Sequence, residues 1–188
     1  MSTDEGPVQT LPEQTPFPVR RERRRAMDAP LRDFLTGESA LLDDREYQEW
    51  LDLLDPDFLY QIPVPLLRED PYLARHSDRA MLFEATKHIL ELKLGRVGLR
   101  HAWSDRPGGV TRRFLGAVRV FTTGRPGTWR VDSGVLATWT RGRDEAALAT
   151  AAREDLVTEL PDGIYRLDRR RVLLDTEVPT HEQLSIIF

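Results

Sequence analysis

Four histidines are the residues of this sequence with the widest catalytic and metal-binding repertoire, and their spacing decides what they could do. His76, His88, His101 and His181 show no spacing typical of metal ligands. The chain contains no cysteine, which excludes disulfides, thiolate catalysis and any iron–sulfur cluster that needs thiolate ligands from this chain. We therefore expect no cofactor and no metal in this chain.

One histidine is spaced with two carboxylates. Glu84, His88 and Glu91 stand at i, i+4 and i+7, so on a helix they would share one face. A carboxylate–histidine metal site of the helical-bundle type would also need matching ligands on a second helix, and the sequence offers none. We interpret this face as a surface or an interface.

Two further polar groups have a simple structural interpretation. His101, Trp103 and Asp105 precede a predicted strand. A His–Asp pair could act as a base, but we favour the simpler interpretation of a packed tryptophan with hydrogen-bonded neighbours. The charged residues 153–155 are interpreted as a salt-bridged turn or strand edge, because surface ion pairs are abundant and individually weak. We name none of these residues as catalytic.

Composition limits the possible classes of protein. The 188 residues are 40% hydrophobic and 31% charged with a net charge of −4, as expected for one globular domain without a general affinity for nucleic acid or anionic membranes. No apolar run approaches the roughly 20 residues of a membrane helix, and no secretory signal is visible. We expect a cytoplasmic protein.

Residues 1–29 are predicted to form an N-terminal arm, extended or partly disordered, followed by a single domain over 30–188. The arm is rich in proline, lacks periodicity and carries five arginines between positions 20 and 25. Its Arg23 and Arg24 are candidates for contact with a neighbouring chain. Binding of nucleic acid is a distant alternative.

The elements of the domain follow from apolar spacing. Helices are predicted over 31–42 and 45–54, the second with Tyr47, Trp50, Leu51 and Leu54 on one face, and a third from residue 77 or 78 to about 95. Strands are predicted over 58–62, 111–122, 129–140, 146–160 and 164–174, with turns that favour antiparallel hairpins. Helices first and strands afterwards predict an α+β domain in which a strongly curved sheet wraps around helices.

Several segments, in order, resemble the β (small) subunit of aromatic-ring-hydroxylating dioxygenases. They are ALLDDREYQEWLDLLDPDFLYQIPVP (40–65), LRHAWSDRPGGVTRRFLGAVRV (99–120), REDLV (153–157) and YRLDRRRVLLD followed by LSIIF (165–188). The resemblance implies a cone-shaped, cystatin-like or nuclear-transport-factor-like α+β fold, with helices packed on a mostly antiparallel sheet. Residues 110–117 depart from the Ser-Arg-Thr-Arg-His and Ser-Asn that are usual in the family, so the aromatic substrate stays open.

The resemblance also implies a partner. Family members assemble with a larger α subunit that carries a Rieske [2Fe–2S] cluster and a mononuclear iron, commonly as three of each subunit. We therefore expect a structural subunit without catalytic residues, in an α3β3 complex. The remaining interface candidates are Trp103, Arg112 and the apolar end of the chain, Ile186, Ile187 and Phe188, which we expect to be buried at or beside a subunit contact.

A stand-alone isomerase or dehydratase on the same cone is the alternative. It would need an inward-facing base and a donor that holds a developing oxyanion. Asp57, Tyr60 and His101 are the candidates for those roles. An open pocket with convergent titratable groups would favour the enzyme, and a cone filled by apolar side chains would favour the scaffold.

Overall fold

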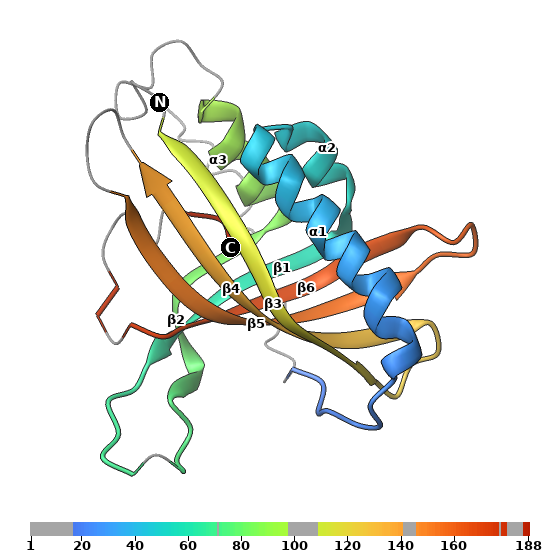
Figure 1. The fold of residues 1–188 in the computed structure, drawn as a ribbon, viewed down its shortest axis with the longest axis horizontal. Helices are drawn as coiled ribbons and strands as arrows, with labels where there is room; N and C mark the ends of the chain where they lie inside the picture. Colours follow the sequence, from blue (N-terminus) through green and yellow to red (C-terminus); the bar gives the residue numbers. More distant parts are fainter. Residues whose placement is uncertain (1–16, 71, 98–108, 141–145, 177, 180–185) are drawn as a thin grey trace, which may run out of the picture.

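The helices of this protein pack on one curled, unclosed six-stranded sheet (Figure 1). The computed structural model describes residues 17–70, 72–97, 109–140, 146–176, 178–179 and 186–188. In chain order the elements are η1 (Arg25–Met27), α1 (Asp28–Asp44), α2 (Tyr47–Asp52), β1 (Leu54–Pro65), β2 (His76–Thr86), α3 (Lys87–Val97), β3 (Val110–Thr122), β4 (Thr128–Thr140), β5 (Ala147–Glu159) and β6 (Tyr165–Leu174).

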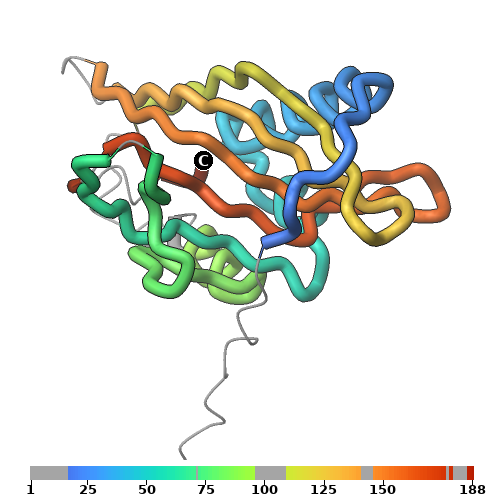
Figure 2. The backbone as a smooth tube through the Cα atoms, turned by 90° about the horizontal axis from the view of Figure 1, so that it is seen from below, coloured from blue at the N-terminus to red at the C-terminus, as the bar shows by residue number. Residues whose placement is uncertain are grey.

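The strands lie in the order β2-β1-β6-β5-β4-β3. Among the strands of the described residues, β1 and β6 are parallel, and the other neighbouring pairs are antiparallel. The sheet coils so strongly that α1 lies across its inner side (Figures 1 and 2). The α+β class, with helices on a strongly curved and mostly antiparallel sheet, is confirmed.

The third predicted helix is wrong over its first half. Residues 76–86 form strand β2, and helix α3 begins only at Lys87. Met81, Phe83 and Ala85 alternate toward the interior, and Phe83 and Ala85 pair with Ile62 and Tyr60 of β1. Pairing with a buried neighbour strand outweighs the weak helical spacing of this segment.

Helix α3 also presents a different face from the predicted one. Leu90 and Leu94 are buried, while Ile89 and Leu92 are exposed. Glu84 lies on β2, and so it does not share a helix with His88 and Glu91. This separates the carboxylate–histidine group that the helical spacing had suggested.

Strand β1 is longer than predicted. It begins at Leu54, which had been assigned to the preceding helix, and it runs through both prolines to Pro65. The register against β2 shifts at Pro63 and again before Pro65. A proline lacks the N–H that a regular ladder needs, so the strand continues past each one only with an irregularity.

Alternation along the later strands separates an inner face from an outer face. On β5 the buried residues are Ala149, Ala151, Arg153, Asp155 and Val157, and each intervening residue is less buried. Helix α1 covers the inner face with Leu31, Leu35, Glu38, Ser39 and Leu42. The predicted strands over 111–122, 129–140, 146–160 and 164–174 are confirmed within a few residues at each end.

Residues 17–24 run along the outer face of the sheet. The guanidiniums of Arg130 and Arg169 each lie over the ring of Phe17, at 5.1 and 5.5 Å from its centroid. Arg20 forms a 2.6 Å ion pair with Asp132 of β4. This part of the predicted arm is therefore attached to the sheet, while residues 1–16 lie outside the described part of the chain.

Candidate functional site

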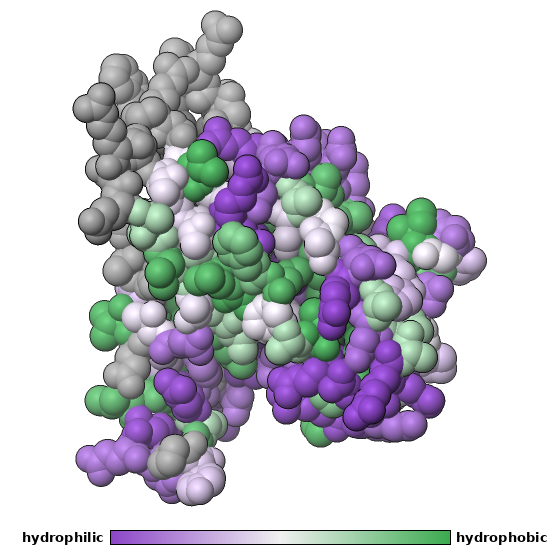
Figure 3. All heavy atoms as spheres, viewed as in Figure 1, coloured by the Kyte–Doolittle hydropathy of each residue, from purple (hydrophilic) through white to green (hydrophobic). Residues whose placement is uncertain are grey.

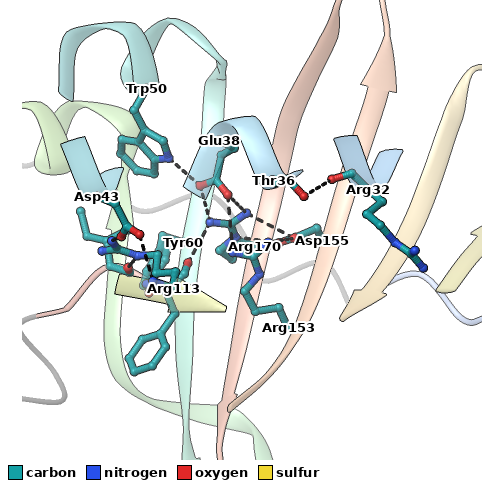
Figure 4. Close-up of polar contacts among 12 residues, drawn as sticks. Arg32, Thr36, Glu38, Asp43, Trp50, Tyr60, Arg113, Arg153, Asp155 and Arg170 are labelled. Carbon is teal, nitrogen blue, oxygen red and sulfur yellow. Dashed lines mark hydrogen bonds and ion pairs between the residues drawn. The ribbon is translucent and has the colours of Figure 1, made fainter. Parts of the chain in front are cut away.

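Four charged side chains meet in the interior of the cone: Glu38 of α1, Arg153 and Asp155 of β5, and Arg170 of β6 (Figure 4). All four side chains are completely shielded from solvent. Asp155 and Arg170 face each other across the β5–β6 pair. Glu38 reaches them because it lies on the buried stripe of α1.

The two arginines share the two carboxylates. Arg170 donates from Nε to Asp155 Oδ1 at 2.7 Å and from Nη1 to Glu38 Oε1 at 2.8 Å. Arg153 lies between the same carboxylates, with Nη1 at 3.5 Å from Glu38 Oε2 and Nη2 at 3.3 Å from Asp155 Oδ2. A buried charge is tolerated only when it is paired in this way.

Opposite charges keep the four groups ionised. Burial alone would raise the pKa of the Glu38 carboxyl, but the guanidiniums of Arg170 and Arg153 hold this pKa at about 2. Burial and the nearby Arg170 lower the pKa of Arg153, whereas the carboxylates of Asp155 and Glu38 act to raise it. For Arg170, the two carboxylates outweigh burial and raise the pKa. The two positive and two negative charges of these four side chains offset one another.

Aromatic side chains complete this cluster. Trp50 of α2 donates from its indole N–H to Glu38 Oε1 at 2.6 Å. The Tyr60 hydroxyl on β1 accepts the main-chain N–H of Phe188 at 3.1 Å, and Arg170 donates to the main-chain oxygen of the same residue at 2.8 Å. Burial raises the pKa of the Tyr60 phenol, although the Phe188 N–H and the nearby arginines oppose the shift.

The apolar end of the chain therefore packs against its own interior. Phe188 is fully buried and Ile187 is 6% exposed, while Ile186 is half-buried. The C-terminus lies near the middle of the molecule in both ribbon and tube views (Figures 1 and 2). These side chains thus belong to the core of this chain, and burial alone accounts for the apolar character that pointed to a subunit contact.

The interpretation of residues 153–155 as a strand edge is wrong. Strand β5 lies between β4 and β6, and Arg153 and Asp155 occupy inward positions at its centre. The expected salt bridges do form, but they are buried. The sequence alternation could have predicted this burial, because Arg153 and Asp155 continue the series of inward positions that includes Ala149 and Ala151.

Of the three residues of the enzymatic alternative, the two that the structure describes, Asp57 and Tyr60, are not brought together. Asp57 is exposed near the start of β1, where its N–H donates to Asp55. Tyr60 points into the cone and takes part in the buried cluster. His101 lies outside the described residues, as do Trp103 and Asp105.

The arginines expected at an interface are at the surface. Arg23 forms a 2.6 Å ion pair with Asp28, and Arg24 lies 3.2 Å from Glu22. The backbone of residues 22–24 pairs with the edge of β3. Arg112 is exposed on β3, 3.8 Å from Asp44. Each of these side chains keeps substantial exposure and is accessible to a partner.

An apolar band covers the outer face where β3, β4 and β5 run together (Figure 3). Phe114 is 57% exposed and Leu148 is 61% exposed, with the half-buried Leu136 between the two strands that carry them. Gly116 and Gly134 pair in the next row. This apolar band lies beside charged side chains of the same outer face, such as Arg130 and Glu154.

Within the described residues, no group of three or more histidine, aspartate and glutamate side chains is arranged to hold a metal. His88 Nδ1 and Glu91 lie 3.7 Å apart on the exposed side of α3. None of the described helices is both long and apolar enough to cross a membrane.

The fold and the cluster define a class: an α+β cone whose interior is occupied by paired charges and by the end of its own chain. Residues 37–180 match the family described as ring hydroxylating beta subunit. The chain belongs to that family, since the match spans well over half of its length.

Solved structures share this fold. Naphthalene 1,2-dioxygenase with indole bound in its active site matches with 20% sequence identity over 88% of this chain and 87% of that chain, at a TM-score of 0.77. The beta subunit of a putative aromatic-ring-hydroxylating dioxygenase from Novosphingobium aromaticivorans matches with 21% identity over 83% and 94%, at 0.62. A putative scytalone dehydratase from the same organism matches with 16% identity over 80% and 87%, at 0.57. The expected relation to the cone-shaped folds is confirmed.

Proposed function

We propose that this chain, a β subunit of a ring-hydroxylating dioxygenase, has a purely structural role and contributes no catalytic residue. The catalytic partner is the large α subunit, which holds a Rieske [2Fe–2S] cluster and a mononuclear iron. Three copies of each subunit form an α3β3 complex in the cytoplasm. The reaction that the complex serves is the insertion of O₂ into an aromatic ring, on a substrate that the sequence of this chain does not specify.

The closed interior of the cone is the observation that carries this proposal. A general base must reach a proton of its substrate, directly or through one water. The carboxylates of Glu38 and Asp155 are fully buried and are each committed to two guanidiniums. With a pKa of about 2, Glu38 is also a poor proton acceptor near neutral pH. These groups are suited to holding α1, β5 and β6 together.

A stand-alone enzyme has one observation in its favour. The interior contains convergent titratable groups rather than apolar side chains alone, as does the site of an isomerase or dehydratase on such a cone. However, the hydroxyl of Tyr60 is already engaged with the main chain of Phe188. Since Asp57 is exposed on the outside, the base expected in the sequence does not face this hydroxyl.

Contacts with the partner are proposed at the exposed arginines Arg23, Arg24 and Arg112. The outward-facing guanidiniums can form ion pairs with acidic groups of a neighbouring subunit. Ile187 and Phe188 would support assembly indirectly, because they stabilise the cone that presents these side chains.

Co-expression with the large subunit encoded beside this chain tests the proposal. Native mass measurement of the purified material is expected to give a complex of three of each subunit. A matched preparation of this chain alone should have no oxygenase, isomerase or dehydratase activity. Recovery of the two subunits as separate species, or turnover of a small organic molecule by this chain alone, would contradict it.

A further inference from the structure

Ile187 and Phe188 occupy the cone as a separate ligand would. The two residues lie outside every strand, and side chains hold their peptide groups. Phe188 donates its N–H to Tyr60 and accepts from Arg170, while the oxygen of Ile187 accepts from Arg113 Nε at 2.7 Å. The aromatic ring of Phe188 is fully buried. An aryl group and a nearby carbonyl oxygen are thus recognised together.

The groups that hold Phe188 are positioned by other parts of the protein. Tyr60 and Arg170 are neighbours in the register of the parallel pair β1–β6. The guanidinium of Arg170 is held by Glu38 and Asp155, neither of which belongs to the C-terminal segment. When the donors of a site are already ordered, binding of a ligand does not incur the conformational-entropy cost of ordering them.

The same interior holds hydrogen-bonding groups without a hydrogen-bond partner. They are Nε of Arg153 and the hydroxyls of Ser133 and Ser39, all buried. Arg153 and Ser133 face each other across β5 and β4, and Ser39 follows Glu38 on the covered stripe of α1. Buried polar atoms normally have partners. These groups can therefore accommodate at least one additional acceptor oxygen.

We propose that the interior of the cone is a binding site for an aryl group that carries a carbonyl oxygen, and that Ile187–Phe188 occupies this site in the free chain. The phenyl ring, two carbons and main-chain oxygen of Phe188 correspond to the ring, the two-carbon chain and the acyl oxygen of a 3-phenylpropanoyl compound. Arg170 donates to the main-chain oxygen of Phe188 and Arg153 Nε has no hydrogen-bond partner, so the site can take a neutral carbonyl compound or a carboxylate. The site is separate from the scaffold role and does not depend on it.

Binding and occupancy by Phe188 are mutually exclusive, so removal of the ring should strengthen binding. The full chain with Phe188→Ala is titrated with 3-phenylpropanamide, 3-phenylpropanoate and propylbenzene by isothermal titration calorimetry. Wild type and Phe114→Ala, which removes an exposed ring from the outer face, are the matched controls. At least one carbonyl compound is expected to bind Phe188→Ala about tenfold or more tightly than it binds either control, and about tenfold more tightly than propylbenzene binds the same variant.

The preferred carbonyl compound shows whether the site takes a neutral or an anionic group, and either preference supports the proposal. Equal binding of propylbenzene would reduce the site to an apolar hole and overturn it, as would no binding to a folded Phe188→Ala chain. If this variant is unfolded without ligand, one of the carbonyl compounds must restore its native circular dichroism where propylbenzene does not. Failure to do so also overturns the proposal.

Discussion

Removal of the Arg170 guanidinium should be among the most destabilising single changes in this chain. Arg170→Met keeps much of the aliphatic volume but removes both close contacts, at 2.7 Å to Asp155 and 2.8 Å to Glu38, as well as the donor to Phe188. It leaves two buried carboxylates with one guanidinium between them. The loss of one partner from a buried charge network costs about 3–5 kcal/mol in the free energy of unfolding.

The matched control is Arg112→Met, which removes an exposed arginine 3.8 Å from Asp44. An exposed pair of this kind contributes less than about 1 kcal/mol. In a chain of this size, 3–5 kcal/mol corresponds to a melting temperature lower by about 6–20 °C. Thermal and urea unfolding of the purified chains measure both variants. An Arg170→Met chain as stable as Arg112→Met would refute the argument that the buried cluster holds the cone together.

Three further changes test other parts of the structure. Glu38 has a folded-state pKa of about 2 against an ordinary value of 4.5, so its ionisation contributes about 3 kcal/mol to the free energy of unfolding above pH 4.5. This contribution is lost as the pH falls toward 2. Acid unfolding of Glu38→Gln should lack this part of the pH dependence, and a profile identical to that of the wild type would contradict the assigned role of Glu38. Trp50→Phe should lower the free energy of unfolding by about 1.5–3 kcal/mol in urea titrations, because Glu38 loses a hydrogen bond to a charged acceptor, and a loss below 0.5 kcal/mol would show that the bond contributes little. Ala85→Asp, at a buried inward position of β2, should prevent stable folding, whereas Leu82→Asp, on a side chain 38% exposed, should change the melting temperature little. Thermal unfolding followed by circular dichroism compares the two variants, and a Leu82→Asp chain as unstable as Ala85→Asp would contradict the alternation of inward and outward side chains in this strand.

The sequence predicted those elements whose local pattern and tertiary role agree. Helix α2 carries its apolar residues on one face, and turn residues that suit hairpins join β3 to β4 and β5 to β6. Gly127 and Gly163 adopt positive φ angles of 69° and 83° in two of these turns. Here local preference and hydrophobic pattern point to the same structure.

Strand β2 could not be predicted from its own residues. Its apolar residues fit both a helix and a strand, and the decision rests on the pairing of Phe83 and Ala85 with a strand more than 20 residues earlier in the chain. The length of β1 was underestimated for a related reason, since its prolines are tolerated only where the register against β2 shifts.

The buried cluster was missed because charged residues are almost never fully buried unless they are paired. Glu38, Asp155 and Arg170 come from three distant parts of the chain, and nothing local identifies them as partners. Arg153 and Asp155 did alternate with alanines at inward positions, and this was the available signal. The terminal Phe188 was correctly expected to be buried, but its contacts with Tyr60 and Arg170 required the folded chain.

Oxygenase turnover of the large subunit, produced with and without this chain and compared at equal amounts of large subunit, tests the central claim most directly. The account predicts that turnover is lost or strongly reduced without this chain, together with the assembled complex, and returns when the chain is added during folding. Undiminished turnover by the large subunit alone would contradict it.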